Sequence, residues 1–145
     1  MVLIHTLQEQ IWTVLMLAVS GFALWRGGWP ERLVAVANVL ASLASGLAEN
    51  RRDFIDPQWG VMVIDVLFLA LLFWLALRSD RHWPMWAAAF QLLAVVTHGA
   101  MMADPSVGGW AYITGYIIWG YMVLASLSVG TWFVARARLR QAMAP

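Results

Sequence analysis

Five apolar segments, each close to the length of a membrane-crossing helix, dominate the sequence. A helix needs about 20 mostly apolar residues to cross the hydrocarbon core of a bilayer. The connections between the segments are short, and only 12% of the residues are charged, against about 25% in an ordinary soluble domain. We therefore predict an all-α, polytopic transmembrane helical bundle that forms a single domain over residues 1–145. The predicted spans cover about residues 7–25, 30–48, 59–77, 83–103 and 110–135.

The second segment is the least apolar, and its central part, residues 33–48, is rich in Ala and Ser. It either crosses the bilayer shielded by the other helices or lies at the interface, which leaves four spans. The second and fourth segments both begin with Trp-Pro, and Asp56 and Asp104 precede the third and fifth as predicted N-caps. Stretches 29–50 and 83–104 also have equal length, which suggests a parallel two-helix repeat, unless Trp and Pro simply recur at helix ends.

The distribution of arginine predicts the orientation. All nine basic residues are Arg, and with five spans seven of them fall on one side. The positive-inside rule then places the C-terminus in the cytoplasm and the N-terminus outside. Short loops and the exclusive use of Arg favour a multi-pass protein of a cell inner membrane. The seven are Arg26, Arg32, Arg78, Arg81, Arg136, Arg138 and Arg140, and the other two are Arg51 and Arg52.

Asp65 is a charged residue in the middle of an apolar segment. Such a group costs roughly 2.5–3.5 kcal/mol on insertion scales, so it normally faces the bundle interior and has a partner. At 1.5 Å per residue, Asp65 lies about 12 Å from the start of its helix, and His98 lies at a similar depth. The predicted ion or proton site comprises Asp65, His98, Thr97 and Ser42. The alternative is a structural role, in which Asp65 forms a buried pair that locks the packing of the helices.

Two further faces carry polar or small residues at helical spacing. The small and polar residues of the second segment predict a face for close helix packing, with a pore lining as the alternative. They are Asn38, Ala41, Ser45 and Gly46. On the fifth, glycines alternate with aromatic residues, which suggests contact with a partner or with lipid, or else packing inside the bundle. The residues of that second face are Tyr112, Gly115, Trp119 and Gly120. Gln91, in the fourth segment, lies deeper than Asp65 and nearer the cytoplasmic half, and we expect it to form an interhelical hydrogen bond.

Recognisable catalytic chemistry is missing from the sequence. There is no cysteine, and His5, His82 and His98 are spread over different depths, so we expect neither a metal nor a haem. No glycine-rich phosphate loop, His-Glu-x-x-His motif or serine nucleophile is evident. The net charge of +1 gives no field that would attract nucleic acid. The sequence therefore predicts a protein that is not an enzyme, without a cofactor or a nucleic-acid partner.

These observations favour a small non-enzymatic subunit of a membrane assembly. It would lie in the lipid bilayer and pack against another integral membrane protein or against itself, because it has little mass outside the spans. The alternative is an oligomeric small transporter or channel in which Asp65, with His98, is the proton or cation site.

Overall fold

The computed structural model describes residues 2–48, 59–103 and 109–143 of the chain. Within these ranges there are five α-helices and no strand, which confirms the predicted all-α class. The helices are α1 (Val2–Arg26), α2 (Trp29–Ala48), α3 (Trp59–Arg78), α4 (Trp83–Ala103) and α5 (Gly109–Ala142). The predicted N-caps Asp56 and Asp104, and also Arg51 and Arg52, lie outside the described residues.

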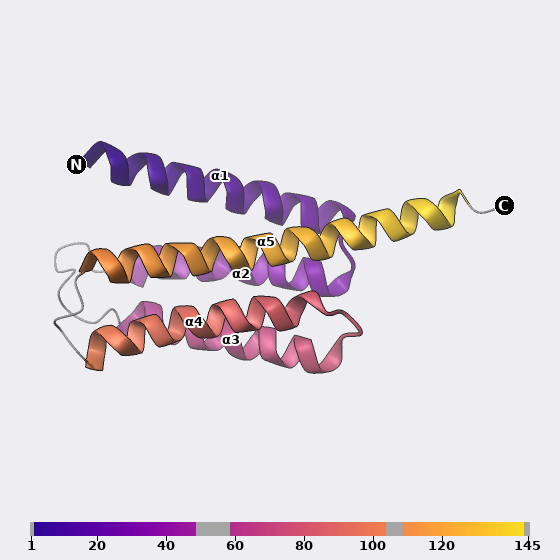
Figure 1. Ribbon diagram of the computed structural model, residues 1–145. Coiled ribbons are helices and arrows are strands. Elements are labelled where there is room, and N and C mark those ends of the chain that lie inside the picture. The colour runs from indigo at the N-terminus through magenta and orange to yellow at the C-terminus, as the bar shows by residue number, and fades with distance from the viewer. Residues whose placement is uncertain (1, 49–58, 104–108, 144–145) are drawn as a thin grey trace.

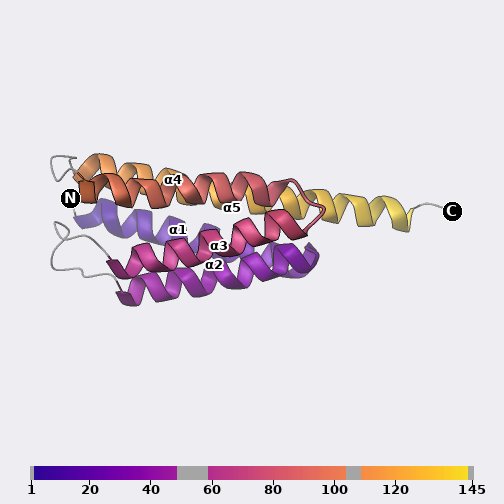
Figure 2. The ribbon, with the colours of Figure 1, turned by 90° about the horizontal axis from the view of Figure 1, so that it is seen from below.

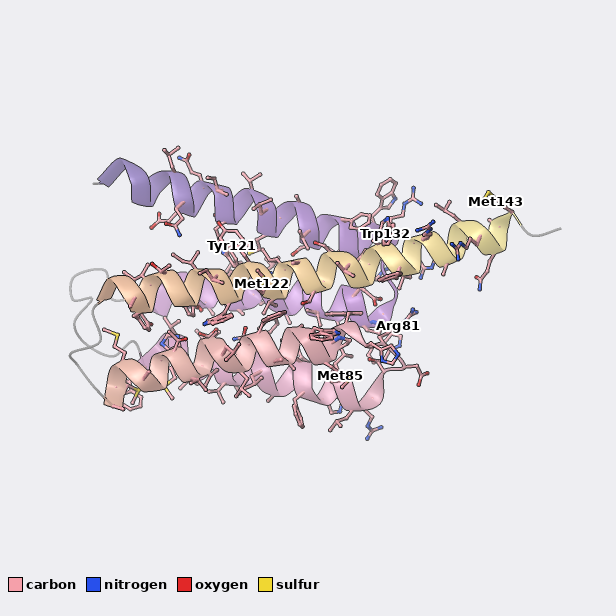
Figure 3. The ribbon with its side chains drawn as sticks, in the orientation of Figure 1. Arg81, Met85, Tyr121, Met122, Trp132 and Met143 are labelled. Carbon is pink, nitrogen blue, oxygen red and sulfur yellow. The ribbon has the colours of Figure 1, made fainter. Side chains whose placement is uncertain are left out.

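The helices run side by side, and each is antiparallel to the next (Figure 1). Figure 2, seen from below, shows that α2 runs along the bundle beside α3 rather than across it. The turns between α1 and α2 and between α3 and α4 lie at the end from which α5 leaves the bundle. We call this the arginine end, because Arg26, Arg78 and Arg81 lie there (Arg81 is labelled in Figure 3). Arg138 also donates a hydrogen bond to the carbonyl of Arg26 there, at 3.3 Å.

Four of the described helices are long and apolar enough to cross a membrane. They are the segments Leu7–Arg26, Trp59–Arg78, Trp83–Ala103 and Ala111–Ala142. The helix α2 is not among them; it has Glu31 and Arg32 in its first turn and several small or polar residues beyond.

The helix α5 is longer than the segment predicted from hydropathy, which ended near residue 135. Its 34 residues extend about 50 Å, against roughly 30 Å of bilayer hydrocarbon. The added turns consist largely of Ala, Leu, Arg and Gln, which are strong helix formers. The helix therefore continues past the other four and protrudes from the arginine end (Figure 1).

The hydrophobic core is concentrated toward the arginine end. Fully buried alanines on three helices let the backbones approach one another closely, and leucines fill the remaining space. The residues of this core are Ala23, Val34, Ala35, Phe68, Leu72, Leu75, Trp83, Ala87, Ala88, Val123 and Leu127.

A buried carboxylate joins three helices at this end. Glu31, with 0% exposure, accepts a hydrogen bond at Oε1 from the Trp83 indole and one at Oε2 from the backbone N–H of Gly28, both at 2.8 Å. The second bond is the Glu half of a capping box at the start of α2. A Cβ at Gly130 would collide with the Trp83 ring. We call Glu31, Trp83 and Gly130 the arginine-end joint, because it ties α2, α4 and α5 together.

The two Trp-Pro helix starts, which suggested a repeat, lie in different environments. Trp83 is 7% exposed within the arginine-end joint, whereas Trp29 is 57% exposed and touches only the edge of Trp74 among the ring contacts of the described residues. The shared dipeptide therefore serves the same function at both helix starts, fixing the first turn, but the two tryptophans pack differently.

Candidate functional site

The buried carboxylate of Asp65 lies between two side chains of α4. Asp65 is 8% exposed. Its Oδ1 accepts a hydrogen bond from Gln91 Nε2 at 3.0 Å, and its Oδ2 lies 3.0 Å from His98 Nε2. Gln91 Nε2 also lies 3.3 Å from the backbone carbonyl of Asp65. Each carboxylate oxygen therefore has its own partner, which lowers the cost of burying the charge.

His98 extends the chain of hydrogen bonds to α5. Its Nδ1 lies 2.8 Å from the hydroxyl of Tyr112. With a hydrogen on Nε2, His98 donates to Asp65 while Nδ1 accepts from Tyr112, so every donor meets an acceptor. The rings of Tyr112 and Tyr116 both meet the His98 ring edge to face, at 5.4 and 5.1 Å between centroids. We call Asp65, Gln91, His98 and Tyr112 the Asp65 network.

Helical periodicity brings the Asp65 network together. On α3, Asp65 shares the buried face with Val61, Phe68, Leu72 and Leu75. On α4, Gln91 and His98 are seven residues apart, which is two turns, and share a buried face with Ala87 and Ala94. The two α4 side chains therefore approach the carboxylate from opposite directions along the helix.

A cavity of about 370 Å³ adjoins the Asp65 network. Its volume falls in the range of roughly 300–1,000 Å³ that is typical of small-molecule sites. All five helices contribute to its wall, and the network contributes Asp65, Gln91 and Tyr112. The cavity lies in the half of the bundle away from the arginine end, where the N-terminal part of α1 diverges from α5 (Figure 1).

The small and polar face of α2 borders this cavity. Asn38, Ala41, Ser42, Ser45 and Gly46 all line it. No atom of a neighbouring element lies within 4 Å of the place where a Gly46 Cβ would stand, so the close approach predicted there is not present. Asn38 is 6% exposed, and its Nδ2 is buried without a hydrogen-bond partner. Ser42 thus shares a cavity with Asp65, as the predicted site required.

Thr97 takes part in a different contact from the one predicted. Its hydroxyl donates to the carbonyl of Leu93 at 2.8 Å and accepts from the Trp119 indole at 3.2 Å. A Cβ at Gly115 would lie 3.6 Å from the Thr97 methyl group. The Trp119 ring also stacks on Phe90, with 6.5 Å between centroids. Thr97 therefore connects α4 to α5 one face away from the Asp65 network.

The aromatic and glycine face of α5 makes its contacts within the chain. A Cβ at Gly120 would come within 3.0 Å of the Trp12 ring, so the glycine gives α1 room to approach. Trp12 meets Tyr121 edge to face at 5.3 Å, and Figure 3 shows Tyr121 on the side of α5 that faces α1. The residues predicted as partner or lipid contacts each have a neighbour within the chain and are also partly exposed; they are Tyr112, Gly115, Trp119 and Gly120.

Sequence reasoning did not find every member of the site. Gln91 was expected to form an interhelical hydrogen bond, but its partner, Asp65, was not identified. Tyr112 was placed on a contact face rather than against His98. Glu9 and Trp12, which line the cavity from α1, were not singled out. The available signal was their spacing of three residues on one face of α1.

Among residues 2–48, 59–103 and 109–143, no group of three or more His, Cys, Asp or Glu side chains is arranged to hold a metal ion. In comparisons with known proteins, no family model, no curated protein and no solved structure matches the chain.

Proposed function

We propose that this chain is a small membrane transporter in which Asp65 is the proton or cation site. The observation that carries the proposal is the position of Asp65 on the wall of a cavity to which all five helices contribute. A residue that only locks helix packing does not call for a space of about 370 Å³ beside it, because protein interiors leave few voids larger than a water molecule. Intramembrane acids that border a cavity commonly mark ion or proton pathways.

The proposed layout has five spans, with the N-terminus outside and the C-terminus in the cytoplasm of a bacterial-type inner membrane. Two features support it. The helix α2 runs alongside the four apolar helices, and most of the described arginines lie at the arginine end. In this layout the cavity lies in the outer half of the bilayer.

The Asp65 network suits a site that alternates between two charge states. With a neutral His98, the carboxylate leaves one negative charge beside the cavity, which attracts a cation. A proton added to the Asp65–His98 pair cancels that charge and weakens the attraction. Gln91 donates a hydrogen bond to the other carboxylate oxygen, Oδ1, which fixes the carboxylate from a second side chain.

The test is flux through the purified protein in liposomes. We expect Asp65→Asn to reduce cation or proton flux by more than about tenfold, because it removes the charge and keeps a side chain of the same shape. The control is Asp80→Asn, which neutralises an exposed carboxylate in the turn between α3 and α4, outside the cavity lining and the arginine-end joint, and is expected to leave flux unchanged. Loss of thermal stability with normal flux in Asp65→Asn would show that Asp65 is structural.

A second candidate function is that of a subunit in a membrane assembly, with another integral membrane protein or a second copy as the partner. The observation that favours it is the protruding end of α5, whose Arg136, Arg138 and Arg140 are exposed. Native mass spectrometry of the protein extracted from its own membrane tests this function. A stoichiometric complex that is lost when residues 136–145 are removed would support it, and an unaccompanied chain would rule it out.

A further inference from the structure

We infer that the cavity binds a monovalent organic cation with an apolar, preferably aromatic, body. The inference rests on the proposed function, because it takes Asp65 as the charged group that meets the ligand. It names the chemical class of the substrate, which the proposal of a proton or cation site leaves open.

The first argument is the charge of the cavity wall. Among the residues that the structure describes, its lining includes two carboxylates, Glu9 and Asp65, and neither Arg nor Lys. The other polar residues of the lining, such as Asn38 and Ser42, are neutral. His98 is not part of the lining, although its Nε2 contacts Oδ2 of Asp65. An anion would therefore meet only like charge, whereas a cation meets an acceptor with lone pairs to spare.

The second argument is the aromatic character of the same wall. Trp12, Phe68, Tyr112, Tyr116 and Tyr121 all line the cavity. Aromatic faces attract cations, and quaternary ammonium groups are recognised in this way because they lose little hydration when they leave water. The Trp12–Tyr121 and Tyr112–Tyr116 ring pairs lie on the wall as pre-arranged surfaces. This combination of aromatic rings and a carboxylate is suited to an organic ammonium group.

The third argument is size. A cavity of about 370 Å³ is far larger than one water, whose share of liquid volume is about 30 Å³. A bare metal ion would need several ligands at bonding distance, and the described residues offer no group of three acidic, His or Cys side chains arranged to hold one. A ligand that fills the space must bring its own apolar surface to the aromatic wall.

Three probes of one shape separate charge from size. Benzyltrimethylammonium, neopentylbenzene and phenylmethanesulfonate each carry a benzyl group on a tetrahedral centre and differ in charge. Binding of radiolabelled benzyltrimethylammonium to the full-length protein in lipid nanodiscs is measured against empty nanodiscs, and the other two compounds serve as competitors. We expect the cation to bind, the neutral analogue to compete at least about tenfold more weakly, and the sulfonate not to compete.

Two pairs of variants locate the binding. We expect Asp65→Asn to weaken binding of the cation by about tenfold or more, with the exposed Asp80→Asn, outside the cavity, as the control that leaves it unchanged. We expect Trp12→Leu to weaken binding about threefold to tenfold, and Trp86→Leu, an exposed tryptophan that does not line the cavity, to have no effect. If Asp65→Asn does not fold, the comparison of Trp12→Leu with Trp86→Leu tests the inference without it.

The outcomes separate this inference from the function on which it rests. Equal competition by the neutral or anionic probe, or equal affinity in Trp12→Leu and Trp86→Leu, would overturn the inference. Flux of protons or Na⁺ that depends on Asp65, without binding of benzyltrimethylammonium, would also overturn it while the proposed function stands. If neither flux nor binding depends on Asp65, both fail together.

Discussion

A carboxylate buried in an apolar bundle needs donors, and Asp65 has one for each oxygen, Gln91 Nε2 and His98 Nε2. Both donors belong to α4, so one helix fixes the position of the charge on α3. Tyr112 then fixes His98 from α5. A buried polar network of this kind is stable only when every member is satisfied, because an orphaned group costs more than its bond contributes.

Tyr112→Phe tests this network at the level of a single hydroxyl. The substitution keeps the ring against His98 and removes the hydrogen bond to Nδ1. We expect the free energy of unfolding to fall by about 0.5–1.5 kcal/mol, the usual net contribution of such a bond. Titration with SDS in mixed micelles measures it.

Tyr121→Phe is the matched control for this prediction. Its ring remains edge to face with Trp12, and we expect a change within about 0.5 kcal/mol. Equal losses in the two variants would mean that the Tyr112 hydroxyl does not support His98.

The membership of this network is only partly readable from the sequence. Counting residues from helix ends places Asp65 and His98 at similar depths, and the structure brings them to 3.0 Å. The same counting separated Gln91 from Asp65 by depth. It failed there because a glutamine side chain spans most of a helical turn. The contact between Tyr112 and His98 depends on which face of α5 points into the bundle. The apolar residues of α5 are not confined to one face, so its sequence does not predict that orientation.

At the scale of elements, α4 and α5 are joined at three levels of the described chain. The contacts are His98 with Tyr112 beside the cavity, Trp119 with Thr97 in the middle, and Trp83 against Gly130 at the arginine end. Because Gly130 has no Cβ, the Trp83 ring can pack directly against the backbone of α5. Glu31 accepts a hydrogen bond from Nε1 of the same ring, so α2 is fixed against both helices through one indole.

Gly130→Ala is expected to destabilise the bundle. The added methyl group would collide with the Trp83 ring and force a shift in a well-packed region, at a cost of about 1–3 kcal/mol. The free energy of unfolding in SDS measures this, together with quenching of tryptophan fluorescence.

Gly21→Ala is the matched control, because nothing lies within 4 Å of the added methyl group. In a helix interior that change is expected to be neutral or to stabilise by up to about 1 kcal/mol. A Gly130→Ala protein as stable as Gly21→Ala would show that the contact with Trp83 is not tight.

The helix boundaries were largely predictable, since apolar runs flanked by Trp-Pro or by Arg mark most of them. The four candidate spans agree with the predicted segments, apart from the extension of α5. The arginine-end joint was not predicted. Glu31 sits three residues after Gly28, which is a capping-box spacing, but nothing in the sequence of α2 reveals that its other oxygen meets Trp83.

At the scale of the whole molecule, packing is uneven along the bundle axis. The core residues gather toward the arginine end, and the cavity lies in the other half, between the start of α1, the end of α2 and the first half of α5. Hydropathy predicts neither the cavity nor its side of the bundle, because apolar residues face lipid and core alike.

Labelling of single cysteines tests the five-span layout, and the chain has no cysteine of its own. We expect Arg52→Cys to react with a membrane-impermeant maleimide on intact cells, and Arg32→Cys to react only after the cells are opened. The reason is that α2 lies between these two positions. Reaction of both from the same side would mean that α2 does not cross the membrane.

The arginine-end joint also has a mechanical consequence. When a helix is held at one end, a change in its tilt displaces the opposite end most. A tilt of roughly 5° over a helix about 30 Å long displaces the far end by about 2–3 Å. The joint lies beside the core, and the far half of α2 lines the cavity. A small change of angle at the joint therefore changes the width of the cavity while leaving the packed end almost unmoved.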